Sequence, residues 1–201
     1  MDPTAFATAY ALSTSIGLRP FLTLALASLA MHLGYLHPSH AFAYLGSDGA
    51  TVILALLAVV EFAGDKIPVV DHTLHVLHVA TKPLAAALLV GSVVPDIGPG
   101  DAVGYALMGA GALNALGVHG SVAALRGAST VTTAGFGNPF VSLAEDALAV
   151  FATALAFFAP YVGAALAVLV TIALVLVARA ILRATRAPAS ASAGTNLTQL
   201  R

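Results

Sequence analysis

Residues 68–94 read PVVDHTLHVLHVATKPLAAALLVGSVV, a stretch long enough to cross a bilayer that nevertheless contains ionisable side chains. Four of these recur at helical spacing and share one helix face: Asp71, His75, His78 and Lys82. Charged groups at bilayer depth cost at least about 2.5–3.5 kcal/mol each, and they usually face a bundle interior or a water-filled cavity. The stretch therefore predicts a transmembrane helix whose polar face lines an intramembrane site.

The composition of the whole chain agrees with a membrane setting. Of its 201 residues, 59% are hydrophobic and 8% are charged, whereas a soluble domain carries about 25% charged residues. We therefore expect the lipid bilayer to be its main partner. The formal net charge of −1 provides no basic patch for nucleic acid, and the absence of cysteine excludes disulfides and thiol chemistry.

Apolar segments divide the chain and predict an all-α polytopic membrane protein with about six transmembrane helices, some broken or half-spanning. The segments are 4–36, 49–64, 68–94, 101–125, 138–159 and 161–183. The first would be about 50 Å long as one helix, so we expect a break at Gly17, Arg19 and Pro20. Residues 1–186 then form one transmembrane domain with candidate halves 1–95 and 100–186, and residues 187–201 form a disordered cytoplasmic tail.

The distribution of Lys and Arg predicts an orientation. Six spans with a cytoplasmic N-terminus place Lys66, Arg126 and the C-terminal arginines on one side. The loops expected on the other side, 37–48 and 95–100, contain neither Lys nor Arg. We therefore expect a multi-pass protein of the bacterial cytoplasmic (inner) membrane with both termini in the cytoplasm.

A weak internal sequence similarity links TSIGLRPFLTLALA at 14–27 with TAGFGNPFVSLAED at 133–146. Pro-Phe pairs align at positions 20 and 139. Two halves with an odd number of spans each would form an inverted repeat, a plan that many transporters use. Chance recurrence in a low-complexity sequence is the alternative interpretation.

Further polar residues also fall on common helix faces. Glu61 and Asp65 lie four residues apart, and His119 lies seven residues before Arg126. The remaining candidate transport or binding residues are Arg19, Asn138, Ser142, Glu145 and Asp146. Oxygen and imidazole ligands suit divalent cations, and histidine also relays protons.

These residues support more than one chemical interpretation. The hypothetical metal ligands are Glu61, Asp65, His75, His78 and Glu145. Arg19 and Lys82 would act as counter-ions. Alternatively, Asp71 caps the start of its helix, the two histidines make interhelical hydrogen bonds, and the carboxylates at 61 and 65 form exposed ion pairs.

Catalysis is not expected. No G-x-S-x-G elbow surrounds a serine, and no H-E-x-x-H zinc motif occurs. The glycine-rich stretch 109–120 follows no strand and precedes no acidic residue at the required distance, so it is no nucleotide fingerprint. We expect neither an enzyme nor a cofactor.

Three sequence elements resemble the bacterial membrane family known as domain of unknown function DUF4126. They are EFAGDKIPVVD at 61–71, TKP at 81–83, and STVTTAGFGNP at 129–139 followed by Glu145. The resemblance implies a compact multispan inner-membrane protein and no particular activity. The motif positions that it carries over are Arg19, Glu61, Pro68, Asp71, Pro83, Asn138, Pro139 and Glu145.

A looser likeness is to small manganese and calcium exchangers, whose repeats carry E-x-G-D-K/R before a hydroxyl residue. The segment 61–66 is similar, with one extra residue before Gly64 and with Ile67 in place of the hydroxyl residue. The second half offers only the acidic pair at 145–146.

Together, these patterns predict a small membrane transporter or channel-like protein that moves a cation. The most specific version of this prediction is a divalent cation whose transport is coupled to protons. A non-transporting membrane scaffold or assembly subunit is one alternative. A transporter of a small anionic solute, bound near Arg19, Lys82 and a helix N-terminus, is another. The expected partners are lipid and a small ion or solute, and self-association into a homo-oligomer stays open.

Overall fold

The structure, a computed structural model, describes residues 2–95 and 101–186, apart from the side chains of residues 68–72 and 185–186. Seven α-helices and one 3-10 helix account for most of these ranges, without any strand. They are α1 (Pro3–Leu18), α2 (Pro20–His32), η1 (His40–Gly46), α3 (Asp48–Gly64), α4 (Pro68–Val93), α5 (Ala102–Thr133), α6 (Asn138–Phe158) and α7 (Pro160–Arg186). The all-α prediction is confirmed, and the predicted tail 187–201 lies outside the described residues.

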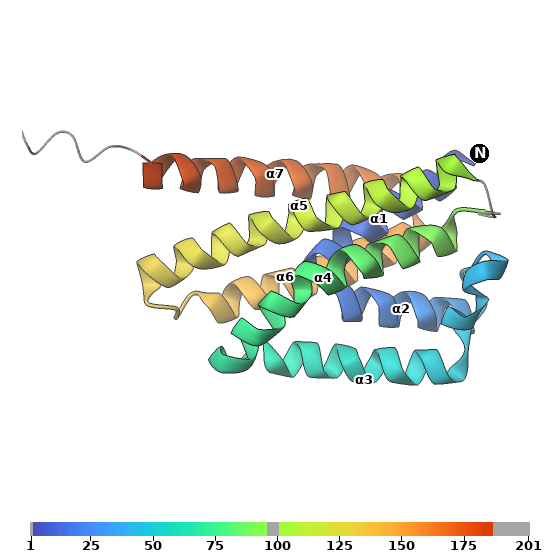
Figure 1. Cartoon of the computed structure of the whole chain (residues 1–201), viewed down its shortest axis with the longest axis horizontal. Helices are drawn as coiled ribbons and strands as arrows, with labels where there is room; N and C mark the ends of the chain where they lie inside the picture. The colour runs from blue at the N-terminus through green and yellow to red at the C-terminus, as the bar shows by residue number, and fades with distance from the viewer. Residues whose placement is uncertain (1, 96–100, 187–201) are drawn as a thin grey trace, which may run out of the picture.

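The helices lie side by side along one long axis (Figure 1). Helices α4, α5, α6 and α7 are each long and apolar enough to cross a membrane, and the bent pair of η1 and α3 passes the same test. The outward surfaces are apolar too: Val52 and Leu56 on α3 and Leu169 and Leu176 on α7 are all more than half exposed. Such a surface is typical of helices that face lipid, and the chain is therefore a multi-pass membrane protein.

Helix starts follow known capping rules. The Oδ1 atom of Asp2 accepts a hydrogen bond from Thr4 N at 2.9 Å, and Asp101 does the same for Gly104 N at 3.0 Å. Proline occupies the first turn of five helices at Pro3, Pro20, Pro68, Pro139 and Pro160, where its missing N–H is not needed. Pro83 lies inside α4 without ending it.

The first apolar segment is broken where the sequence predicts it. Arg19 separates α1 from α2 in an extended conformation, with φ −136° and ψ 96°, and Pro20 starts the new helix. Proline removes one backbone donor and clashes with the preceding turn, which explains why the helix stops.

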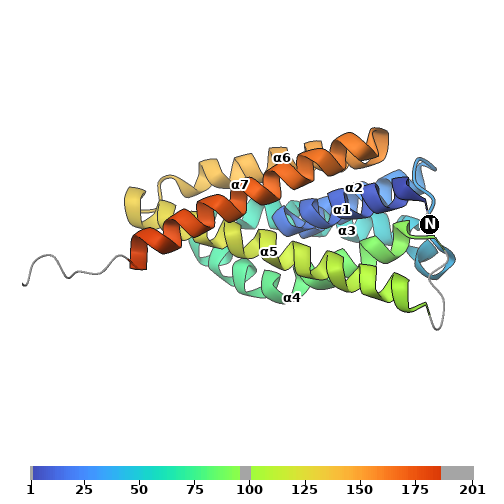
Figure 2. The same ribbon diagram turned by 90° about the horizontal axis from the view of Figure 1, so that it is seen from above.

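Helix α2 folds back along α1 instead of continuing in the same direction (Figures 1 and 2). Ser15, near the end of α1, bonds to Ala149 of α6 at 3.5 Å. Thr8, near its start, bonds to Ala156 at 3.4 Å, so α1 and α6 run in opposite directions. Helices α1 and α2 thus form a re-entrant hairpin whose tip, Arg19–Pro20, lies inside the bundle.

This hairpin changes the expected topology. Because α1 and α2 begin and end at the same end of the bundle, only α3 to α7 cross it completely (Figure 1). The start of α1 therefore lies at the end opposite to the C-terminal end of α7. The sequence-based placement of both termini on one side does not agree with this arrangement, since it counted the first segment as one crossing.

The two similar segments, 14–27 and 133–146, have the same direction in the bundle. Helices α1 and α5 run in the same direction, and α2 and α6 both run back toward the end where α1 begins (Figures 1 and 2). The turns at Pro20 and Pro139 are therefore related by a parallel arrangement. The expected inverted topology does not describe them, because two crossings, α3 and α4, lie between the two units.

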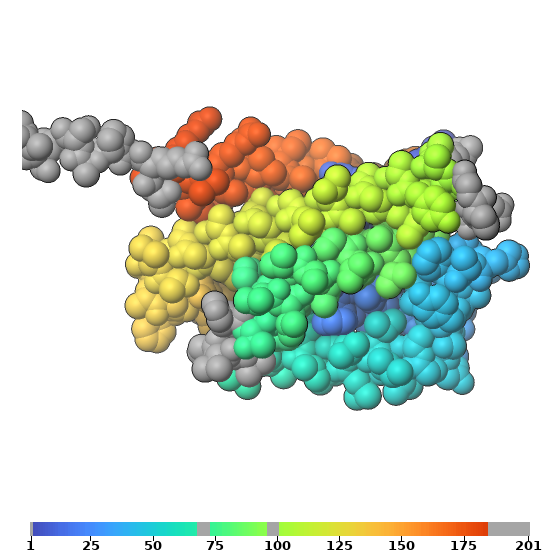
Figure 3. Space-filling view, viewed as in Figure 1, coloured from blue at the N-terminus to red at the C-terminus, as the bar shows by residue number. Residues whose placement is uncertain are grey.

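The hairpin lies in the interior, and from one side α4, α5 and α3 cover most of it (Figure 3). Leu12 and Ile16 of α1 are completely buried. A Cβ atom at Gly17 would lie 2.5 Å from Cβ of Val118 on α5. The absence of a side chain at this position lets α1 and α5 approach closely, just before the hairpin tip.

Candidate functional site

Arg19 forms the centre of a buried charge network at the hairpin tip. Its side chain is only about 2% exposed and pairs with Asp65 and, through Nε, with Oδ1 of Asp146 at 2.7 Å. The Nη2 atom donates to Ser142, at 3.1 Å to the carbonyl oxygen and 2.8 Å to Oγ. It lies 3.8 Å from Oε2 of Glu145. One guanidinium thus joins α6 to the end of α3.

The acidic face of α6 is arranged as its spacing predicts. Ser142, Glu145 and Asp146 are all buried and lie three or four residues apart or adjacent, so that they meet Arg19 together. Asn138 lies one turn earlier, and its Nδ2 donates to Oγ1 of Thr130 at 2.9 Å. It does not join the network around Arg19, but it lines the adjacent cavity.

Arg126 is the member of the site that the sequence-based list of candidates omits. Its Nε and Nη2 atoms lie 2.9 and 3.0 Å from the two carboxylate oxygens of Glu145. Nη2 is also 3.5 Å from Oδ2 of Asp65. The seven-residue spacing from His119 was the signal that could have identified Arg126, because both side chains lie on the inner face of α5.

Charges in this network balance among the described residues. The acidic members are Asp65, Glu145 and Asp146. The basic members are Arg19, Arg126 and Lys66, whose Nζ lies 3.3 Å from Oδ2 of Asp146. A buried charge is tolerated only when it is paired and hydrogen-bonded, and here each carboxylate meets at least one basic side chain.

Two further charged residues cap the helix ends at the hairpin tip, which are the end of α1 and the start of α2. Oε2 of Glu61 accepts hydrogen bonds from the backbone N–H groups of Phe21 and Leu22, both at 3.1 Å. Nζ of Lys82 donates to the carbonyl oxygens of Gly17 and Leu18, both at 2.9 Å. Helix ends leave such groups without intrahelical partners, and the charges have the signs that the helix dipole favours.

Three histidines of α4 and α5 lie next to these capping residues. The ring centroids of His75 and His119 are 4.5 Å apart, and those of His78 and His119 are 6.4 Å apart. Nε2 of His78 lies 3.3 Å from Oε1 of Glu61. The predicted shared face of His75, His78 and Lys82 is therefore present, whereas the side chain of Asp71 lies outside the described residues.

The proposed metal centre does not assemble in the described part of the chain, where no group of three or more His, Asp or Glu side chains could hold a metal ion. Its five candidate ligands were Glu61, Asp65, His75, His78 and Glu145. Glu61 is occupied by backbone N–H groups, and Asp65 and Glu145 are occupied by arginines. Asp65 and Glu145 are thus neutralised by cations of the protein itself.

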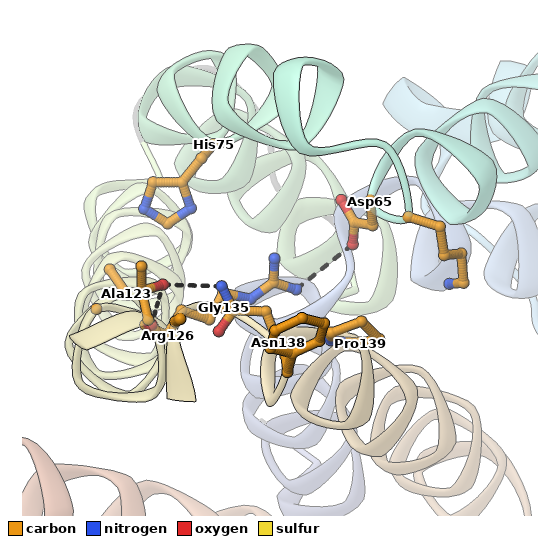
Figure 4. A pocket seen from close by; sticks show the side chains of 12 residues that line it. Asp65, His75, Ala123, Arg126, Gly135, Asn138 and Pro139 are labelled. Carbon is orange, nitrogen blue, oxygen red and sulfur yellow. Dashed lines mark hydrogen bonds and ion pairs between the residues drawn. The ribbon is translucent and has the colours of Figure 1, made fainter. Parts of the chain in front are cut away.

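An open cavity of about 680 Å³ lies beside the network (Figure 4). Its polar lining consists of Asp65, Lys66, His75, Arg126, Thr130 and Asn138. Arg126 reaches from the cavity wall toward Asp65 in Figure 4. The cavity is bounded by the α5–α6 turn, and it lies at the bundle end where α3 passes into α4.

A second, much smaller void of about 10 Å³ lies deeper. It shares Asp65, His75 and Arg126 with the open cavity. The other polar residues that line it are Arg19, His78, Lys82, His119 and Glu145. The charge network therefore separates the open cavity from a smaller, deeper polar void.

A family profile described as a domain of unknown function, DUF4126, matches residues 6–180. No curated protein and no solved structure matches the chain. The looser likeness to manganese and calcium exchangers finds no support in these comparisons. Because the matched region covers most of the 201 residues, the chain belongs to the DUF4126 family.

Proposed function

We propose that this protein is a small transporter or channel-like protein that moves a small polar solute across the bacterial cytoplasmic membrane. The observation that carries the proposal is the re-entrant hairpin beside an open polar cavity. At its tip, the end of α1 and the start of α2 contact buried charged side chains. Discontinuous helices with ionisable residues at membrane depth are typical of solute sites in transporters.

The orientation follows from the basic residues. Helices α3, α5 and α7 end at the same end of the bundle (Figure 1). This end therefore also contains Lys66 just after α3, Arg126 in the last third of α5, and Arg179 and Arg183 near the end of α7. Cytoplasmic loops carry an excess of such residues. The open cavity then faces the cytoplasm, and the start of α1 faces the opposite side.

The charges of the cavity favour an anionic solute over a divalent cation. Its lining contains two permanent cations, Lys66 and Arg126, and one carboxylate, Asp65. Asp65 already pairs with Arg19 as well as with Arg126. A metal ion would have to displace these arginines, whereas an anion meets Lys66, whose side chain lines the cavity and is partly exposed. Among cations, the proton suits the site best, because histidines and carboxylates exchange it without a metal cluster.

A scaffold function is the second candidate, and the complete pairing of the network favours it. Ion pairs such as Arg126 with Glu145 fix the register of neighbouring helices without any ligand. A scaffold, however, gives no reason for an open polar cavity next to the pairs. Solute binding therefore separates the two functions.

The test is thermal unfolding of the full chain in detergent against a panel of solutes: phosphate, sulfate, carboxylates, amino acids, Mg²⁺, Mn²⁺ and Ca²⁺. A solute that binds only the folded state raises the free energy of unfolding, by about 2.7 kcal/mol at 100 times its dissociation constant, and so raises the midpoint temperature. We expect an anionic or zwitterionic solute to do so, and we expect Asn138→Ala and Lys66→Gln to abolish the shift.

Asn114→Ala is the matched control, because this amide bonds to Ser13 and Thr14 far from the cavity. It should lower the midpoint without changing the solute-dependent shift. A shift specific to a divalent metal would overturn the anionic cargo, and no shift by any solute would support the scaffold instead.

A further inference from the structure

A line of titratable side chains leads from the open cavity to the start of α2. His75 lines the cavity, and its ring lies 4.5 Å from that of His119. The ring of His119 lies 6.4 Å from that of His78. Nε2 of His78 is 3.3 Å from Oε1 of Glu61. The line therefore links α4, α5 and α3 across the inside of the bundle.

A small void beside this line has room for one water molecule. The void of about 10 Å³ is lined by all three histidines, and a buried water needs roughly that volume and two to four polar partners. Within the described residues, three buried atoms on the line have no hydrogen-bond partner: Nδ1 of His119, Nε2 of His78 and Oε1 of Glu61. These atoms provide the donors and acceptors that a proton path requires.

We propose that His75, His119 and His78 carry a proton between the cavity and Glu61. This path would couple proton movement to transport, so the inference rests on the transport function proposed above. A hydronium ion in the cavity transfers a proton to one ring nitrogen of His75 and leaves as water, and the proton on the other ring nitrogen leaves toward His119. The same exchange repeats at His119 and His78. The last proton binds the Glu61 carboxylate, so each imidazole ends neutral and one carboxylic acid forms.

Charged groups face this path from every neighbouring element. Lys82 lies on α4 and Arg126 on α5, Arg19 is at the hairpin tip, and Glu145 and Asp65 come from α6 and the end of α3. The basic groups repel a proton that stays on a ring, whereas the Glu61 carboxylate attracts it. This arrangement favours passage of the proton over storage on the histidines.

Protonation of Glu61 would act directly on the hairpin. The ionised carboxylate holds the N–H groups of Phe21 and Leu22. Hydrogen bonds to an ionised acceptor are about twice as strong as neutral ones. A proton on Glu61 therefore weakens the start of α2, immediately after Arg19 at the centre of the charge network.

The experiment is a stopped-flow pH jump on the full chain in lipid nanodiscs, followed by infrared absorption of the protonated carboxylic acid. We expect a band that disappears in Glu61→Gln, which assigns it. In His119→Phe the band should reach the same amplitude about 100-fold more slowly, the low end of what a positioned proton-transfer group contributes. His37→Phe, in an exposed loop at the other end, should leave the rate unchanged.

Two results would overturn the proposal: no band sensitive to Glu61→Gln, or an unchanged rate in His119→Phe. If His119→Phe does not fold, as judged by circular dichroism and gel filtration, His75→Gln tests the same path at its half-buried entrance. Failure of the path is distinguishable from failure of the transport function. An unchanged rate with an intact solute-dependent thermal shift rejects only the histidine path.

Discussion

Arg126 and Glu145 form a two-pronged ion pair, with Nε to Oε1 at 2.9 Å and Nη2 to Oε2 at 3.0 Å. The pair joins the last third of α5 to the first half of α6. It also separates the open cavity from the smaller, deeper void, because Arg126 lines both and Glu145 only the latter. The same contact thus serves the packing of the bundle and the boundary of the site.

Removing one member of this pair should destabilise the protein strongly. We expect Glu145→Gln or Arg126→Gln to lower the free energy of unfolding by about 3–5 kcal/mol, because each leaves a buried charge without its partner. The double variant Arg126→Met with Glu145→Leu should recover most of this loss. Equilibrium unfolding in mixed micelles measures the free energy of unfolding of all these variants. A loss in the double variant equal to the sum of the two single losses would contradict the pairing.

Arg19→Lys should be damaging although the charge is conserved. The Arg19 side chain contacts Asp65, Asp146 and Ser142 in different directions. A lysine ammonium is a point charge without the planar fork and cannot reproduce that pattern. We expect a loss of about 2–4 kcal/mol, of the order found when a buried hydrogen-bonded charge loses partners.

The control for Arg19→Lys is Arg179→Lys on the exposed part of α7, where the effect should stay within about 0.5 kcal/mol. The same unfolding titration serves both variants. Equal stability of Arg19→Lys and the unmodified protein would mean that the guanidinium geometry at the tip has no importance.

Glu61→Gln should loosen the start of α2 in particular. The substitution keeps one acceptor oxygen but removes the charge that binds the N–H groups of Phe21 and Leu22. We expect a loss of about 1–3 kcal/mol, with faster hydrogen exchange at these two amides. Exchange at Ala86 of α4, buried beyond Lys82, is the internal reference, and equal acceleration there would indicate general destabilisation instead.

Glycines of α5 and α1 offer a packing test with a built-in comparison. At Gly17 a Cβ atom would lie 2.5 Å from Cβ of Val118, whereas at Gly109 and Gly120 nothing lies within 4 Å. We expect Gly17→Ala to cost about 1–3 kcal/mol through overpacking. Gly109→Ala and Gly120→Ala should be neutral or stabilise by up to about 1 kcal/mol through helix propensity.

The sequence was sufficient for the helices and for the faces within each helix. His75, His78 and Lys82 share one face because they are three to seven residues apart, a consequence of helix geometry alone. Pro20 after Arg19 predicts a break for an equally local reason. Which side chains meet across helices depends on tertiary packing, and no residue spacing encodes it.

Two errors show where local patterns stop being informative. A proline break permits both a kink and a reversal, so the return of α2 and the separation of the termini were not visible at Arg19–Pro20. The metal hypothesis counted acidic residues without their partners. Arg126, near the end of α5, counted as an orientation signal and as a polar residue seven positions after His119, and only its contacts with Glu145 place it inside the site.

The topology itself can be tested, because the chain contains no cysteine. A single cysteine at exposed Arg183, near the end of α7, should react with a membrane-impermeant maleimide only after the inner membrane is opened. A cysteine at Thr4, near the start of α1, should react in intact spheroplasts, because the hairpin places it at the opposite end. Thr132→Cys at the end of α5 is exposed and provides a second cytoplasmic control. Labelling of Thr4→Cys only in opened membranes, together with the other two, would mean that the first apolar segment crosses once and that the hairpin does not form in the bilayer.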